Sequence, residues 1–270
     1  MSQPVESITS AANPRIKALA TLRRKGASAD DSRILIDGHR EITRAAQAGL
    51  AMQELYLCRA LLHGDDHATL VNELQTRGVW IIDVPEHVFE KIRYGDRAGG
   101  LVAVAQRPHR TLADLRLSAA PLLAIVEHVG KPGNLGAILR SADGAGVEAV
   151  LVVDSAIDVY GPNVIRAGVA TIFRIPVVEL TAADAAAFLA TNSIQIVAAS
   201  PDGRTDYTQL DYRRPTAFVF GAEDRGLSAA WTGQNITAAR IPMKGIGDSL
   251  NVSTTAALFF YEAVRQRAAR

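Results

Sequence analysis

The chain has 270 residues, of which 48% are hydrophobic, and a formal net charge of +1. These values are typical of a globular protein of one or two domains. They exclude a membrane-spanning helix, since no apolar run is long enough to cross a bilayer, and the single Cys58 excludes an internal disulfide and argues against a cysteine zinc site. Because no apolar signal-peptide core opens the chain, we expect a cytoplasmic protein.

The first hundred residues alternate between expected helices and strands. A helix should begin at Asn13-Pro14, because proline is favoured in the first turn, and its apolar residues Ile16, Leu19, Ala20 and Leu22 should face a core. Strands are expected at 32–38, 54–58, 79–84 and 101–105, and further helices at 41–48 and 69–77. This alternation predicts a small α/β domain.

Basic residues concentrate on the first expected helix. Within residues 1–25, Glu6 is the only acidic residue, against the basic residues Arg15, Lys17, Arg23, Arg24 and Lys25. We expect them to line the side of the helix opposite its apolar stripe. A lone basic helix is more often a solvated surface than a binding site, so both interpretations stay open at this point.

Two histidines and two aspartates suggest a metal site at His63-Gly64-Asp65-Asp66-His67. One glycine and two aspartates make this segment a poor helix, so the two histidines need not share a face. We therefore favour a solvated loop and expect no metal.

The character of the chain changes after the polar, proline-bracketed segment 107–121, which is the best linker candidate. Near-continuous apolar runs indicate strands that are buried on both faces, at 122–126, 150–153, 174–178, 194–198 and 217–220. Helices are expected between most of them, at 136–145, 163–169 and 182–190. The pattern predicts a parallel sheet covered on both sides.

The segment 241–253 is expected to be a ligand-binding loop. It connects a short strand at 236–240 to a helix at 254–267, and Gly245 and Gly247 let its backbone approach a ligand closely. Candidate N-cap side chains are Ser249, Asn251, Ser253 and Thr254. One face of the helix carries Ala257, Leu258, Tyr261 and Val264.

Two other enzyme classes were weighed. Gly247-Asp248-Ser249-Leu250 matches the GDSL string of a hydrolase family, but all six histidines precede it, whereas the catalytic histidine of that family follows. The glycine-rich segment 127–141 suggests a nucleotide-dependent α/β enzyme, with Asp154 as a ribose ligand, although its glycines do not fit G-x-G-x-x-G and no P-loop is present.

Three strings, in this order, resemble the signature motifs of one family. They are Asn134-x-Gly136-x-x-x-Arg140, then Phe220-Gly221-Ala222-Glu223-Asp224-Arg225-Gly226-Leu227, and then the segment 241–253 with Ile-Pro-Met and Ser-Leu-Asn-Val-Ser. The family is the SpoU, or TrmH-like, branch of the SPOUT superfamily, whose members methylate ribose 2′-hydroxyls of RNA. Each string is a weak signal alone, but three in the family's order are specific.

The resemblance implies an α/β fold in which a trefoil-knotted parallel-sheet SPOUT methyltransferase domain, at 119–270, follows a small L30e-like RNA substrate-binding domain at 1–108. It also implies S-adenosyl-L-methionine as cofactor, a homodimer and an RNA substrate. We favour ribosomal over transfer RNA. An RNA-binding homologue without activity is disfavoured, because the polar residues of the motifs are retained together.

The resemblance also assigns site residues. It places cofactor contacts at Gly221, Ile241, Met243 and Leu250, catalytic groups at Asn134, Arg140, Glu223 and Asn251, with Ser253 as a further candidate, and RNA contacts at Arg15, Lys17, Arg23, Arg24 and Lys25. Because a guanidinium has a pKa above ~12, we expect Arg140 to anchor a phosphate and not to act as a base.

Overall fold

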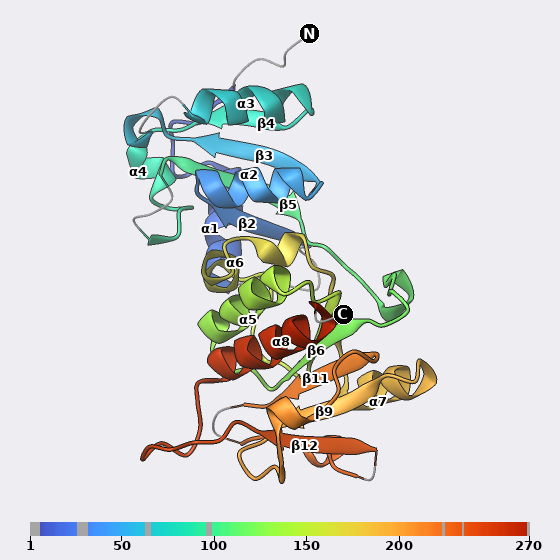
Figure 1. Ribbon diagram of the computed structural model, residues 1–270. Coiled ribbons are helices and arrows are strands. Elements are labelled where there is room, and N and C mark those ends of the chain that lie inside the picture. Colours follow the sequence, from blue (N-terminus) through green and yellow to red (C-terminus); the bar gives the residue numbers. More distant parts are fainter. Residues whose placement is uncertain are drawn as a thin grey trace. The chain divides into compact units, whose positions relative to one another are not determined.

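The computed structural model describes residues 6–25, 32–62, 66–95, 99–222, 225–233 and 235–268. The chain forms two compact units, of which the first contains Met1–Pro108 and Tyr160–Phe173 and the second contains His109–Val159 and Arg174–Arg270 (Figure 1). Residues 160–173 thus pack with the first unit, although they lie within the range expected for the second domain.

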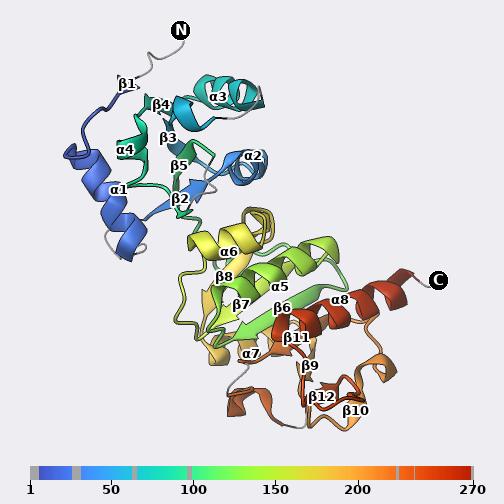
Figure 2. The ribbon, with the colours of Figure 1, turned by 90° about the vertical axis from the view of Figure 1, so that its left-hand side faces the viewer.

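The first unit is built on a mixed five-stranded sheet in the order β1-β4-β3-β5-β2. Its strands are β1 (Glu6–Ser7), β2 (Arg33–Asp37), β3 (Met52–Leu57), β4 (Trp80–Asp83) and β5 (Leu101–Gln106). Its helices are α1 (Pro14–Lys25), α2 (His39–Gln47), α3 (Asp66–Thr76), α4 (Glu86–Phe89) and α6 (Pro162–Ala167). Figure 2 shows α1 and α4 on one face of the sheet and α2 and α3 on the other.

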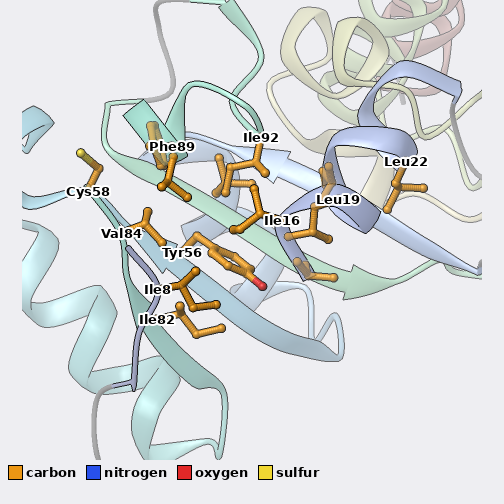
Figure 3. Packing of buried hydrophobic residues seen from close by; sticks show 14 residues of the cluster. Ile8, Ile16, Leu19, Leu22, Tyr56, Cys58, Ile82, Val84, Phe89 and Ile92 are labelled. Carbon is orange, nitrogen blue, oxygen red and sulfur yellow. The ribbon is translucent and has the colours of Figure 1, made fainter. Parts of the chain in front are cut away.

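The core of this unit confirms the apolar stripe expected on α1. Ile16, Leu19 and Leu22 are buried and pack in one cluster with Tyr56 of β3 and Phe89 of α4 (Figure 3). The stripe fixes which side of α1 faces the sheet, because residues three and four apart share a helix face.

The second unit is built on a seven-stranded sheet in the order β10-β12-β9-β11-β6-β7-β8, and every strand pair in it is parallel. Its strands are β6 (Leu122–Glu127), β7 (Ala149–Val153), β8 (Val177–Leu180), β9 (Gln195–Ala199), β10 (Thr205–Asp206), β11 (Thr216–Phe220) and β12 (Ile236–Arg240). Its helices are α5 (Pro132–Gly144), α7 (Ala182–Thr191) and α8 (Val252–Ala268). Short 3-10 helices lie at Leu112–Asp114, Tyr207–Gln209 and Ala229–Trp231 in this unit, and at Arg59–Leu61 and Thr171–Phe173 in the first unit.

Strand β11 shows how both faces of this sheet are covered. Ala217 and Val219 share a buried cluster with residues of α7. On the opposite face, the Phe218 ring packs edge-on against Phe259 of α8, with the ring centroids 5.3 Å apart. The predicted α/β fold with a parallel, doubly covered sheet is therefore confirmed.

One expected strand is corrected, and the structure shows which face of α8 is buried. The strand expected at 174–178 lies at Val177–Leu180. The face of α8 that carries Leu258 and Tyr261 is not the core face, because these side chains are 37% and 52% exposed. The core face consists of Ala256, Phe259, Phe260 and Ala263, which follow the spacing of a buried helical stripe. Among the described residues, no helix is both long and apolar enough to cross a membrane.

Candidate functional site

A cavity of about 290 Å³ lies in the second unit, where the neighbouring strands β9, β11 and β12 end. Its walls include Ala199 and Ser200 after β9, Phe220 and Gly221 at the end of β11, and Ile241 after β12. Ligands of open parallel sheets bind beyond the carboxyl ends of the strands. The fold therefore places this cavity where a ligand site is expected.

All four residues proposed as cofactor contacts line this cavity, namely Gly221, Ile241, Met243 and Leu250. Sequence reasoning missed the segment Ala199–Pro201, and it missed Thr255 and Phe259 of α8. The end of the strand expected at 194–198 could have indicated the first of these, because carboxyl ends of parallel strands meet at one edge of a sheet.

Gly221 is required by the close approach of two chain segments. A Cβ placed on it would lie 2.4 Å from the carbonyl oxygen of Gly226 and 2.8 Å from the backbone nitrogen of Leu227. Gly226 itself has a φ of 66°, which favours glycine. A hydrogen bond of 2.9 Å from Gly226 N–H to the Ala222 carbonyl closes the turn. The two glycines thus let the turn fold tightly beside the cavity.

The walls of the cavity are mainly apolar, with a few polar residues. Side chains such as Leu227, Ile241, Leu250 and Phe259 supply apolar contact. Polar side chains enter from Ser200, Asp248, Ser249 and Thr255. Apolar walls with a few polar groups are typical of a small-molecule site, and an adenosine group has the matching flat faces and polar edges.

Two of the proposed catalytic residues are in contact. The Asn251 side-chain amide donates to Asn134 Oδ1 over 3.2 Å, which joins the start of α5 to the start of α8 across 117 positions of sequence. Asn251 Oδ1 accepts hydrogen bonds from Ser253 N–H at 3.0 Å and from Ser253 Oγ at 2.6 Å. Asn251 therefore caps α8, and Ser253 helps to orient it.

The other two proposed catalytic residues are placed differently. Arg140 lies on α5, six positions after Asn134, and its side chain is exposed. Glu223 lies outside the described residues. The structure thus joins Asn134 to Asn251, whereas Arg140 lies on α5 without being among the residues that line the cavity.

The basic residues of α1 do not form one exposed row, contrary to expectation. Lys17 and Arg24 are exposed, whereas Arg23 is bound on the inner side. Its guanidinium donates to Asp37 Oδ1 and to the Ile92 carbonyl, both at 2.8 Å. Arg15 pairs with Glu6 at 2.8 Å and lies 4.6 Å from the centre of the Trp80 ring. The Lys25 side chain lies outside the described residues.

The residues that could bind a metal ion make contacts within the protein. His63 lies outside the described residues, and the His67 ring packs edge-on against His39 at 5.1 Å. Glu127, His128 and Asp154 bring potential ligand atoms within 4.8 Å of one another. Buried Glu127 accepts hydrogen bonds from Ser228 and Trp231, which occupy both of its oxygens. This network links β6 to the loop after β11.

Asp154, the alternative ribose ligand, has a structural contact. Its Oδ2 accepts a hydrogen bond of 3.3 Å from Ala182 N–H, at the first residue of α7. Its backbone has a φ of 47° and its carbonyl is 2.8 Å from His128 Nδ1. Asp154 therefore connects the ends of β6 and β7 to α7, which argues against the dinucleotide interpretation.

Comparison with known proteins agrees with this geometry. The family model of the SpoU rRNA methylases matches residues 121–261, and that of the MRM3-like substrate binding domain matches residues 13–103. The chain is 30% identical to the 23S rRNA (guanosine-2′-O-)-methyltransferase RlmB of Bordetella pertussis, over 87% of this chain and 98% of that protein.

Two solved structures are similar over nearly the whole chain. An RNA 2′-O ribose methyltransferase has a TM-score of 0.82 and 39% identity, covering 97% of this chain and 99% of that one. An AdoMet-bound rRNA methyltransferase from Sinorhizobium meliloti has a TM-score of 0.85 and 25% identity, covering 97% and 98%.

Proposed function

Because the chain belongs to the SpoU rRNA methylase family and is an S-adenosylmethionine-dependent RNA 2′-O-ribose methyltransferase, we propose that its substrate is ribosomal RNA. The observation that carries this choice is the match of both units, since the first resembles a substrate-binding domain and the whole chain resembles an enzyme named for 23S rRNA. Transfer RNA is the alternative.

We propose that the cofactor binds in the 290 Å³ cavity of the second unit. When bound, S-adenosylmethionine supplies an electrophilic methyl group. Ile241, Leu250 and Phe259 would hold its adenine through apolar contact, and the tight turn at Gly221 would let the backbone approach it. No ionised side chain of the protein is needed to make the methyl group reactive, so the protein acts mainly by positioning.

We propose that the asparagine pair and Arg140 handle the RNA at the point of reaction. Asn134 and Asn251 are joined by a hydrogen bond, which holds their side-chain amides in a fixed arrangement. Such pre-oriented groups can hold the ribose hydroxyl in line for attack. The exposed Arg140 would bind the neighbouring phosphate and lower the free energy of the developing alkoxide. Glu223 belongs to the same proposal on the strength of its motif alone.

We further propose that the first unit binds RNA through exposed cations of α1, chiefly Lys17 and Arg24. Phosphate contacts of this kind supply affinity without reading sequence. Arg15 and Arg23 would contribute less, because their guanidinium groups already bond to acidic residues.

The trefoil knot, the homodimer and a cytoplasmic location are also proposals. The knot is supported by the match of residues 121–261 to the SpoU family, whose resemblance implies a knotted domain. The homodimer is supported by Leu258 and Tyr261, which leave apolar surface exposed on α8. Light scattering should give a dimer for the native chain and a monomer for Tyr261→Arg; a native monomer would contradict the proposal.

One experiment tests the substrate. Ribose 2′-O-methylation is mapped across total RNA from cells with and without the gene, and the purified protein is then given deproteinised rRNA and tRNA with labelled cofactor. We expect one or a few rRNA positions to lose methylation in the deletion and to regain it in vitro. If the deletion removes methylation only from tRNA, the substrate is tRNA and not rRNA. If the purified protein transfers labelled methyl groups to neither RNA, the proposed function is wrong.

A further inference from the structure

A second cavity, of about 410 Å³, lies in the first unit and takes no part in the function described so far. All of its lining residues belong to that unit, including those of α6. Its polar walls come from the end of β2 and the start of α2, with Tyr94 and Arg166 completing them. Its volume is within the range of small-ligand sites, ~300–1,000 Å³.

Asp37 lines this cavity and has one carboxylate oxygen without a hydrogen-bond partner among the described residues. Its Oδ1 accepts two hydrogen bonds, from Arg23 Nη2 at 2.8 Å and from Tyr94 N–H at 2.9 Å. Its Oδ2 is buried and has no hydrogen-bond partner in the part of the chain that the structure describes. A buried acceptor left unpaired costs roughly 1–3 kcal/mol, and native structures usually satisfy such atoms. A ligand in the cavity that donates a hydrogen bond would remove this cost.

The orientation of the Asp37 carboxylate is fixed by its partners. Arg23 cannot turn freely, because its Nε also donates to the Ile92 carbonyl at 2.8 Å. Burial raises the pKa of Asp37, whereas Arg23 and the Tyr94 amide lower it. A further N–H donor at Oδ2 would stabilise the charged form in the same way as these two partners do.

The charges around the cavity restrict the kind of ligand. Arg40 and Arg166 line it, so an organic cation would be repelled. Asp37 and Glu41 also line it, so these four side chains carry no net charge, and an anionic group placed at Asp37 Oδ2 would be repelled. A neutral ligand with N–H donors and a flat face avoids both penalties. The Tyr94 ring lies 5.3 Å from the Arg166 guanidinium and 5.9 Å from that of Arg23, and a base would extend this stack from the Arg166 guanidinium, which lines the cavity.

We propose that this cavity binds an unpaired nucleobase of the substrate RNA, and that the exocyclic amino group of the base donates a hydrogen bond to Asp37 Oδ2. This inference rests on the RNA-methylating function proposed above and gives the first unit a means of reading one base. Unpaired bases are read in this way by other RNA-binding proteins, through stacking and hydrogen bonds to the base edge.

The test compares CMP with UMP on the full-length protein, because these nucleotides differ in an amino group against a carbonyl at one ring position. Affinities are measured by saturation-transfer NMR without RNA or cofactor. We expect CMP to bind about tenfold or more tightly than UMP, as one hydrogen bond to a charged group predicts. AMP is compared with IMP, and GMP with IMP, in the same way, because adenine and guanine also carry an exocyclic amino group. Equal affinities in every pair, or no binding of any of these nucleotides, would overturn the proposal.

Two variants sharpen the test. Asp37→Asn keeps an oxygen for Arg23 and Tyr94 and places an amide donor where Oδ2 was, so the preference should shift from CMP toward UMP. Glu41→Gln is the matched control: it removes a charge from the same cavity, but the Glu41 carboxylate already bonds to Arg40. It should keep the native preference. An unchanged preference in Asp37→Asn would also overturn the proposal.

Failure of this inference can be told apart from failure of the function. Cofactor binding and RNA methylation are measured on the same preparations, and thermal melting confirms that each variant is folded. Intact rRNA methylation without discrimination between CMP and UMP would contradict the proposed base-binding cavity but not the proposed methyltransferase function. Discrimination between CMP and UMP without methylation of any RNA would contradict the proposed function but leave the base-binding cavity supported. If Asp37→Asn does not fold, the native comparison alone decides.

Discussion

At the residue scale, Gly221 carries a sharp prediction, because its position has no room for a side chain. In Gly221→Ala the new Cβ would lie 2.4 Å from the Gly226 carbonyl oxygen, so the turn beside the cavity must open. Overpacking of this kind costs roughly 1–3 kcal/mol. We expect S-adenosylmethionine to bind about tenfold or more weakly, as measured by calorimetry.

The matched control is Gly130→Ala, since a Cβ at Gly130 would meet no atom within 4 Å. It should leave cofactor affinity unchanged. Native affinity in Gly221→Ala would show that the turn does not border the bound cofactor.

Arg140 carries the second prediction at this scale. It is exposed on α5 and lies outside the cofactor cavity. Arg140→Ala should therefore lower kcat by about 10²–10³, the effect of removing one donor from a developing oxyanion, while cofactor affinity stays native. Arg140→Lys should also be slow, because an ammonium does not reproduce the planar fork. Single-turnover methylation measures both, and a fully active Arg140→Ala would remove this residue from the mechanism.

At the element scale, α1 combines structural and surface arginines. Arg23 is paired with Asp37 on the inner side, and both side chains are largely buried. Removing one partner of such a pair leaves an uncompensated charge, which costs roughly 3–5 kcal/mol. Arg23→Ala should therefore lower the melting temperature of the first unit markedly. Arg24→Ala, at an exposed neighbouring position, should change stability by less than about 0.5 kcal/mol. Equal melting temperatures would show that the Arg23–Asp37 pair is not stabilising.

The last turn of α8 is held by Arg267. Its guanidinium donates to the carbonyls of Tyr212 and Ala120, at 2.8 and 2.9 Å, and to those of Pro121 and Arg214. Burial lowers the pKa of Arg267. Arg267→Met keeps much of the side-chain volume but leaves these acceptors without the donor, which should cost at least roughly 1–3 kcal/mol. Chemical denaturation followed by Trp231 fluorescence in a Trp80→Phe background, beside cofactor titration, should show lower stability and weaker binding. A native denaturation midpoint would contradict the role.

The elements differ in how far the sequence predicts them. Buried strands such as β6 and β7 are long apolar runs, and both were correctly expected. Short elements such as β1, β10 and α4 have two to four residues and too little pattern to be seen. The buried face of α8 was not predicted, because small and apolar residues surround the helix and only packing selects Phe259 and Phe260.

Contacts between distant residues were the least predictable part of the site. The three motifs identify Asn134 and Asn251 separately, but their hydrogen bond exists only because α5 and α8 begin at the same place. Likewise, the composition of α1 cannot show that Arg23 turns inward, because Asp37 is 14 positions away on β2. The end of β9 could be predicted to lie at the ligand-binding edge of the sheet, but only the strand order, which a single sequence does not contain, places it between β11 and β12.

At the scale of the whole molecule, RNA affinity and cofactor affinity should be separable. The exposed cations Lys17 and Arg24 belong to the first unit, and the cofactor cavity belongs to the second. Neutralising both, in Lys17→Gln/Arg24→Gln, should weaken binding of substrate RNA by removing phosphate contacts. Each lost contact reduces the slope of log affinity against log salt by roughly 0.7 to 0.9, so two contacts predict about 1.4 to 1.8.

Filter binding at several salt concentrations measures this slope, with cofactor calorimetry on the same variant as the control. Cofactor affinity should be native, because neither side chain reaches the second unit's cavity. Both residues are exposed, so the double variant should also melt like the native chain. A native salt slope would mean that α1 faces solvent in the RNA complex. The RNA would then dock on another surface, and the base-reading cavity of the first unit would have to act without phosphate contacts from α1.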